Sequence, residues 1–109
     1  MAFYELRQYK VRRGKMKEWL KIMEEEIIPF QVSKGMVITG SYQGETDDSV
    51  YIWMRRFQSE EERKALYAAV YESEHWKNVV SPQVAELIDR EKIHITRICL
   101  LYTSPSPRD

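Results

Sequence analysis

Alternating apolar and polar residues at the start of the chain predict a β-strand. From Phe3 to Val11, aromatic and branched side chains alternate with charged ones, with the period of two that is typical of a half-buried strand. Arg13-Gly14 follows and predicts a turn. The first element is therefore expected to be a strand that ends in a turn.

The next segment has the periodicity of a helix. Apolar residues recur at three- and four-residue steps from Met16 to Ile27, and Lys and Glu occupy much of the other side. Such a stripe packs a helix against a sheet. Pro29 lacks an amide hydrogen and disfavours helical geometry at Ile28. We therefore expect the helix to end or kink there, with residues 30–34 as an irregular exit.

Two further strand-like runs occupy the middle of the chain. Residues 36–42 and 49–57 are rich in β-branched and aromatic side chains. Polar residues 44–48 separate them and have the length of a hairpin loop. The two runs are expected to pair as antiparallel strands.

The second helical region is expected to begin at Ser59. Its hydroxyl and the carboxylate of Glu62 have the spacing of a capping box, and acidic side chains suit the first turn of a helix. Ser73 offers a second cap, and Ser81-Pro82 fits a cap followed by a first helical residue. We therefore expect a broken helical region, followed by a fourth strand over residues 92–101, where apolar and polar residues alternate again.

The resulting order, βαββαβ, predicts an α+β fold of the ferredoxin-like kind. Its four-stranded antiparallel sheet carries helices on one face and leaves the other face open. The side chains of the third strand that we assign to this open face are Tyr51, Trp53, Arg55 and Phe57. Burying these rings on a second copy would contribute several kcal/mol, at roughly 25 cal/mol per Å² of apolar area. We therefore expect a homodimer that closes sheet on sheet.

Composition excludes some partners and locations. Seventeen basic and seventeen acidic residues cancel, so no net charge draws the protein to nucleic acid or to a membrane surface. No apolar run approaches the roughly 20 residues that span a bilayer, and the start lacks the apolar core of a signal peptide. Cys99 is the only cysteine, which suits a reducing compartment. We expect a cytoplasmic protein with no membrane span and no nucleic-acid partner.

The end of the chain breaks the pattern. Its Ser-Pro repeats cannot continue a sheet ladder, and the segment looks like a translated sequencing-adaptor remnant. We therefore predict one domain over residues 1–98 and a non-native or disordered tail over residues 99–109.

Several short motifs follow one another at a characteristic spacing. They are Tyr4-Glu5-Leu6-Arg7-Gln8-Tyr9, Gly14-Lys15, Ile27-Ile28-Pro29-Phe30-Gln31, Tyr51-Ile52-Trp53-Met54-Arg55-Arg56-Phe57, the helix start Ser59-Glu60-Glu61-Glu62-Arg63, and Tyr71-Glu72-Ser73-Glu74-His75-Trp76-Lys77. Together they resemble bacterial members of the NIPSNAP family over about residues 3–98.

The resemblance implies a dimeric α+β barrel, in which two ferredoxin-like sheets face each other around an interior cavity. It implies less about function, because NIPSNAP proteins are mostly of undefined biochemistry. Similar barrels serve as cofactor-free monooxygenases, haem degraders, dehydratases and small-molecule binders, and a fold does not select among these.

Charged and aromatic residues of the first strand form a candidate site. Glu5, Arg7 and Tyr9 share one face of that strand and point into the barrel if Leu6 faces the helices. Arg7 would bind an anionic or carbonyl oxygen, and Glu5 would act as a base if burial raised its pKa. The alternative is a cross-sheet ion pair that satisfies buried charges at the dimer interface.

The second and third strands would complete this site. Trp53 would supply a flat wall and Arg55 a second cation for a planar acidic ligand, unless both only pack. Tyr42 would add a hydroxyl donor, although a slip of one residue in the strand register would turn it to the helix side. The predicted ligand-binding set is Arg7, Tyr9, Tyr42, Trp53 and Arg55.

Neither a metal nor a cofactor is predicted. His75 and His94 are the only imidazoles, and neither has a ligand partner at helical spacing or an adjoining cluster of Cys and carboxylates. The sequence also lacks a Gly-rich phosphate loop, a nucleophile elbow and a dinucleotide fingerprint. His94 remains a candidate base beside Glu5, or a haem ligand by analogy with haem-binding barrels.

Three functions remain open at this point. The first is a homodimer that binds a small aromatic or anionic metabolite in the barrel cavity. The second is a cofactor-independent monooxygenase-like enzyme, in which Glu5 or His94 takes a proton from a substrate such as a phenol. The third is a protein-interaction module whose acidic helix surface, residues 60–62, meets a partner.

Overall fold

The fold contains the four strands and two helical regions that the sequence pattern predicts. The structure is a computed structural model and describes residues 2–104. The strands are β1 (Phe3–Lys10), β2 (Val37–Gln43), β3 (Val50–Phe57) and β4 (His94–Ile98). The first helical region comprises α1 (Met16–Ile22), the π-helical turn η1 (Met23–Ile27) and α2 (Ile28–Ser33). The second comprises α3 (Glu60–Tyr71), the π-helical turn η2 (Trp76–Val80), α4 (Ser81–Leu87) and the 3₁₀ turn η3 (Arg90–Lys92).

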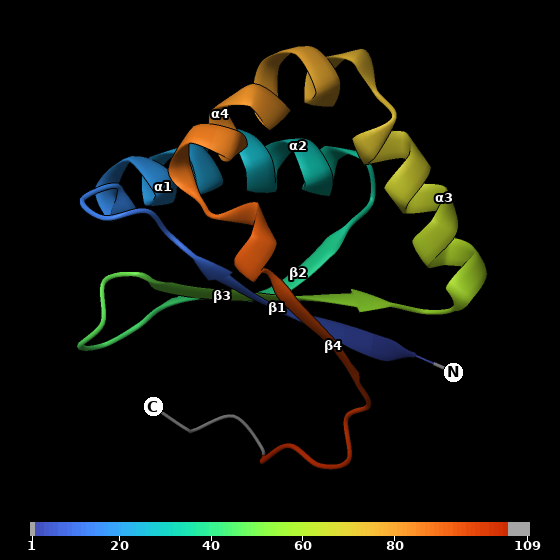
Figure 1. Cartoon of the computed structure of the whole chain (residues 1–109). Coiled ribbons are helices and arrows are strands. Elements are labelled where there is room, and N and C mark those ends of the chain that lie inside the picture. Colours follow the sequence, from blue (N-terminus) through green and yellow to red (C-terminus); the bar gives the residue numbers. More distant parts are fainter. Residues whose placement is uncertain (1, 105–109) are drawn as a thin grey trace, which may run out of the picture.

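The strands form one antiparallel sheet in the order β2-β3-β1-β4. Both helical regions lie on the same face of the sheet, as Figure 1 shows. The two central strands, β1 and β3, pair along their full length, from Phe3 opposite Phe57 to Lys10 opposite Val50. The predicted α+β fold with βαββαβ order is therefore confirmed.

The two faces of β3 are the reverse of those predicted. Tyr51, Trp53, Arg55 and Phe57 are buried beneath the helices, and the alternate residues of the strand are half-buried on the open face. Both parities of this strand are apolar enough to face a core, and a shift of one residue exchanges them. The large rings of β3 fill the space between the sheet and the helices, and the smaller apolar side chains of the strand lie on the open face.

The first helical region runs through Pro29, where we expected it to end or kink. Pro29 lies in the first turn of α2, directly after the π-turn η1. In a π-turn the amide of residue i+5 donates to the carbonyl oxygen of residue i, so the turn contains one residue more than a turn of α-helix. Pro29, which has no amide hydrogen to donate, follows this wider turn. The predicted irregular exit at residues 30–34 is therefore wrong for 30–33, which are helical.

The second helical region has two serine caps and, like the first, a π-turn followed by a proline. Ser59 caps α3, since its Oγ accepts a hydrogen bond from the amide of Glu62 at 3.1 Å, and Ser73 Oγ accepts one from the amide of Trp76 at 3.1 Å. Both predicted caps are confirmed. Ser81 is not a cap, because it is itself helical and Pro82 continues the helix behind η2. Each helical region thus contains one π-turn followed by a proline.

The open face of the sheet is crossed by the chain after β4. Residues 99–104 have no regular secondary structure and pass along this face near Tyr4, Thr39 and Met54 (Figure 1). Residues 105–109, the rest of the predicted tail, lie outside the described residues. That this tail is non-native stays a prediction.

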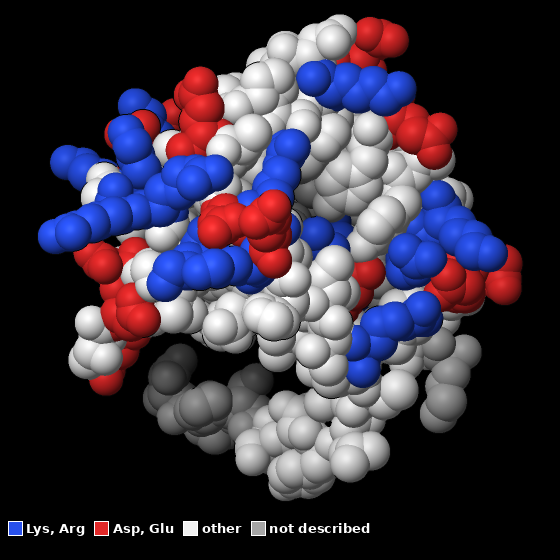
Figure 2. All heavy atoms as spheres, viewed as in Figure 1, with Lys and Arg blue, Asp and Glu red and all other residues white. Residues whose placement is uncertain are grey.

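Charged residues of both signs are interspersed on the face of the molecule drawn in Figure 2, in keeping with the zero formal net charge. Over residues 2–104, no helix combines the length and apolar character needed to cross a membrane.

Candidate functional site

A buried arginine organises the space between the sheet and α3. Arg55 on β3 is fully buried, and its Nη2 donates to Glu5 Oε1 on β1 at 2.7 Å. Its Nη1 donates to Gln31 Oε1 at 2.8 Å and to Tyr71 Oη at 2.7 Å. Tyr67 Oη accepts a further bond from Nη2 at 3.0 Å. The cross-strand pairing of Glu5 with Arg55 places both charges side by side, so the sheet register itself creates this ion pair.

Glu5 is held as a carboxylate by its neighbours. Burial alone would raise its pKa, but hydrogen bonds from Tyr67 and Arg55 outweigh burial and hold the pKa of Glu5 below its ordinary value. The bond from Tyr67 Oη to Glu5 Oε2 measures 2.6 Å. The condition we set for a base, a pKa raised by burial, is therefore not met. The pair lies beneath the helices, where the predicted dimer interface does not reach.

Stability should fall on acidification because Glu5 is paired. A carboxylate whose pKa is lowered by folding stabilises the native state above the unfolded value and loses that contribution as pH falls through the folded value. The ordinary value is 4.5, so the loss should begin near there. Glu5→Gln should be less stable than wild type at neutral pH. Between about pH 7 and pH 3, its free energy of unfolding in urea should fall less than that of wild type. Glu61→Gln on exposed α3 is the control, and an equal loss in Glu5→Gln and wild type would contradict the pairing.

Arg7 lies beside this pair and faces a cavity. Its Nε donates to Tyr9 Oη at 2.9 Å, its Nη1 donates to Tyr67 Oη at 3.3 Å, and Glu5 Oε1 is 3.6 Å away. Burial disfavours its charge, but the oxygens of Tyr9, Tyr71 and Tyr67 hold the pKa of Arg7 above its usual value. The side chain therefore stays a cation although only 12% of it is exposed.

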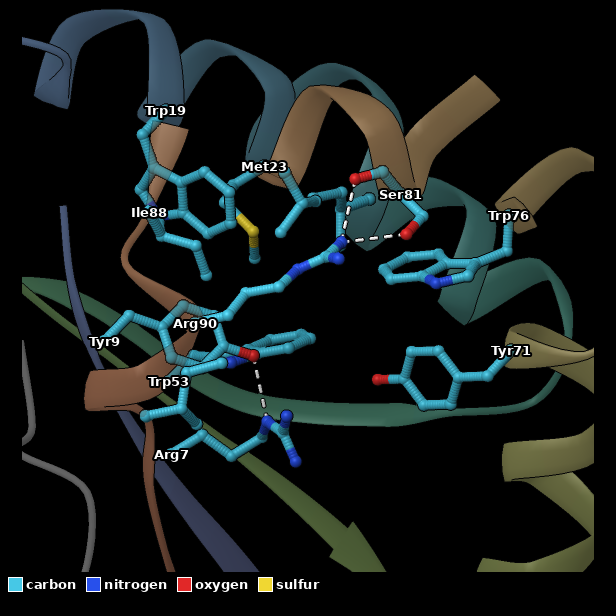
Figure 3. A pocket seen from close by; sticks show the side chains of 13 residues that line it. Arg7, Tyr9, Trp19, Met23, Trp53, Tyr71, Trp76, Ser81, Ile88 and Arg90 are labelled. Carbon is cyan, nitrogen blue, oxygen red and sulfur yellow. Dashed lines mark hydrogen bonds between the residues drawn. The ribbon is translucent and has the colours of Figure 1, made fainter. Parts of the chain in front are cut away.

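The cavity itself lies between the sheet and the helices and has a volume of about 250 Å³. Trp53 and Tyr9 line its sheet side, Trp19 and Met23 come from the first helical region, and Tyr71 and Trp76 come from the second (Figure 3). Both π-turns contribute to this wall, Met23 and Ile27 from η1 and Trp76 from η2. Such turns are often found at functional sites. The lining also includes Ser81, Val84, Ile88, Arg90 and Ile93.

Arg90 of η3 is exposed at the cavity and reaches back to the first residue of α4. Its Nη2 donates to the carbonyl oxygen and to Oγ of Ser81, both at 2.8 Å. Figure 3 shows its side chain passing between the Trp19 side and the Trp76 side of the cavity. The lining therefore contains two arginines, Arg7 and Arg90, and no Asp or Glu.

The structure brings together most of the residues predicted to bind a ligand. Arg7, Tyr9 and Trp53 line this cavity, and Arg55 lies directly behind it. Tyr42 does not join them. A register irregularity in β2 between Ile38 and Gly40 puts Tyr42 opposite Ile52, on the open face, where 54% of it is exposed.

The two candidate bases lie on opposite faces of the sheet. His94 is exposed on β4, paired with Gln8, near Lys92 and Asp47, whereas Glu5 is buried on the helix side. Within residues 2–104, no three His, Cys, Asp or Glu side chains lie close enough to hold a metal ion.

Sequence reasoning missed several residues of this site. Tyr67 and Tyr71 have the i, i+4 spacing that puts two hydroxyls on one helix face, and this spacing was a usable signal. Gln31 and Arg90 carried no comparable signal, because each acts through a contact between distant segments.

Known proteins resemble this chain in sequence and in fold. The NIPSNAP family model matches residues 4–101. A solved NIPSNAP family protein of Agrobacterium tumefaciens strain C58 is 29% identical, with a TM-score of 0.80, and the alignment covers 98% of each chain. No curated protein matches the chain.

Two further solved structures share the fold. A second NIPSNAP family protein of Agrobacterium tumefaciens, with unknown function, is 24% identical with a TM-score of 0.83, covering 95% of this chain and 92% of that chain. A NIPSNAP-like domain protein of Burkholderia xenovorans is 17% identical with a TM-score of 0.83, and the alignment covers 96% of this chain and 90% of that chain.

Proposed function

This chain belongs to the NIPSNAP family, and on that premise we propose that it is a homodimer in which each subunit binds a small aromatic or anionic metabolite between sheet and helices. The family does not name the ligand, since a solved relative is itself of unknown function. The ligand must therefore be argued from the cavity.

The composition of the cavity wall carries this proposal. All three tryptophans of the chain, Trp19, Trp53 and Trp76, line the cavity together with two arginines and no acidic residue. Apolar walls with a few convergent polar groups are typical of small-molecule sites. Flat indole rings favour a planar ligand, and an excess of guanidinium groups favours a negative one.

The proposed site lies inside one protomer. The sequence pattern led us to expect the ligand in the barrel between two sheets, but Arg7, Tyr9 and Trp53 face the helices of their own chain. The proposal therefore keeps the predicted ligand class and moves the ligand to the other side of the sheet.

The open face supports the homodimer. Met54 lies there beside residues 99–103 of its own chain, but Leu6 and Ile52 are only half-buried and Tyr42 is exposed. Apolar side chains that share one sheet face gain from cover by a second copy. The interface would thus form from these residues in place of the large rings of β3.

Ligand binding can be tested through the tryptophans. Titration of benzoates and phenols should quench the intrinsic fluorescence saturably, because all three indoles surround the cavity. Arg7→Ala should weaken binding at least tenfold, since one charge-assisted hydrogen bond accounts for about that factor.

The control for this variant is Arg13→Ala, which removes an exposed arginine from the β1–α1 turn. Native mass spectrometry of the wild type, Arg7→Ala and Arg13→Ala should show a dimer in each case, so that a loss of binding can be distinguished from a loss of assembly. A monomer at micromolar concentration would contradict the dimer, and unchanged affinity in Arg7→Ala would contradict the site.

A further inference from the structure

Two guanidinium groups beneath the helices share one carboxylate. Arg55 Nη2 pairs with Glu5 at 2.7 Å, and Arg7 Nη1 lies 3.6 Å from the same oxygen. The side chains of Arg55, Glu5 and Arg7 are 0%, 4% and 12% exposed. Among residues 2–104, no other acidic side chain pairs with either arginine. One positive charge is therefore in excess in a poorly solvated space, an arrangement that is costly without a counter-anion.

Besides the buried Nε of Arg55, three hydrogen-bond donors of this network have no acceptor among the described residues. Arg7 uses Nε and Nη1 but not Nη2. The hydroxyl of Tyr71 accepts bonds from Arg55 and Gln31, and that of Tyr9 accepts one from Arg7, so both retain a hydrogen to donate. Tyr67 differs, because its hydroxyl hydrogen is given to Glu5.

The three donors belong to side chains that converge on one end of the cavity. Figure 3 shows the hydroxyls of Tyr9 and Tyr71 pointing toward each other from opposite sides, with the guanidinium of Arg7 below and between them. All three side chains line the cavity, and no Asp or Glu does. Donors that converge without an acceptor provide the partners that an anionic oxygen group requires.

The remaining space limits the rest of the ligand. The cavity of about 250 Å³ is smaller than the roughly 300–1,000 Å³ typical of sites for drug-sized ligands. Its walls beyond the donors are mainly Trp19, Trp53, Trp76 and aliphatic side chains. One or two fused rings fit this space.

From the charge excess, the free donors and the flat walls, we infer that the ligand is an aromatic monocarboxylate, with its carboxylate held by Arg7 Nη2, Tyr9 Oη and Tyr71 Oη. This inference rests on the proposed function, because it names the class of ligand for the same cavity. It also adds Tyr71 as a residue that determines specificity for the acid.

A series of probes with one ring system tests the inference on the wild-type protein. Isothermal titration calorimetry would compare 2-naphthoate with its neutral amide 2-naphthamide, the neutral phenol 2-naphthol and the cation 2-naphthylmethylammonium. The carboxylate should bind at least about tenfold more tightly than the amide, because hydrogen bonds to a charged acceptor are stronger than hydrogen bonds to a neutral one. Naphthol binding as tightly as naphthoate would overturn the carboxylate assignment in favour of a phenol.

Conservative variants identify the donors. Tyr9→Phe and Tyr71→Phe should each weaken 2-naphthoate about threefold to tenfold and change 2-naphthamide less. Tyr51→Phe is the matched control, because this buried hydroxyl bonds Ser41 and does not line the cavity. Equal affinity for acid and amide would overturn the inference while leaving the proposed function intact, and no binding of any probe would overturn both.

Discussion

Arg55→Met should lower the free energy of unfolding by about 3–5 kcal/mol, the range measured when one partner of a buried ion pair is removed. Methionine matches much of the length of arginine but leaves Glu5 as a charge that is only 3% exposed. It also removes the donors that Gln31, Tyr71 and Tyr67 accept from. Urea unfolding followed by circular dichroism, at a fixed protomer concentration, measures the difference.

Arg56→Met provides the matched control for Arg55→Met. Arg56 is the next residue of β3, is half-buried on the open face, and has a hydrogen bond of 3.5 Å to Gln58. Its replacement should change stability by less than about 1 kcal/mol, as for most exposed polar contacts. Equal losses in the two variants would show that the buried network does not hold the sheet and α3 together.

Trp19→Ala should cost about 3–5 kcal/mol, because it leaves a large void in the core. Trp19 is 1% exposed, and its ring meets those of Tyr9 and Tyr51 edge-on, with centroids 5.8 Å apart in both cases. Trp19→Phe should cost much less. Its indole nitrogen has no hydrogen-bond partner among the described residues, so the phenyl ring loses area but no hydrogen bond.

The comparison for this prediction is Trp76→Ala on the opposite wall of the cavity. Trp76 is half-buried and packs on Tyr71 with centroids 4.8 Å apart, so a smaller loss is expected. Thermal unfolding by circular dichroism avoids the change in tryptophan signal. If Trp19→Phe proved as unstable as Trp19→Ala, the lone indole nitrogen would have a partner that the contacts do not reveal.

The sequence pattern correctly predicted the order of strands and helices, although residues 30–33 proved helical and the fourth strand is limited to His94–Ile98. Strong local signals account for this, such as the alternation around Tyr4 to Lys10 and the capping box from Ser59 to Glu62. The short motifs also predicted the family correctly. Local signals failed at Pro29 and Pro82, because a π-turn ahead of each lets the helix continue. No single residue type predicts a π-turn.

Most residues of the predicted ligand-binding set lie at or directly behind the cavity, but the sequence did not show on which side of the sheet the cavity lies. Arg7, Tyr9, Trp53 and Arg55 were correctly expected on one face of the sheet. That face proved to be the one beneath the helices. Tyr42 was assigned to the same cavity and lies on the other side, because β2 slips by one residue near Gly40.

The amino-acid sequence by itself determined the order of elements, the sheet-forming segments and the grouping of side chains by strand parity, because these depend on neighbours a few residues apart. Only the tertiary structure decided which parity is covered. The choice depends on how much volume the helices leave above the sheet, and on contacts between distant segments, such as Arg55 with Gln31 and Arg90 with Ser81. Packing of that kind depends on the whole fold, so no local pattern contains it.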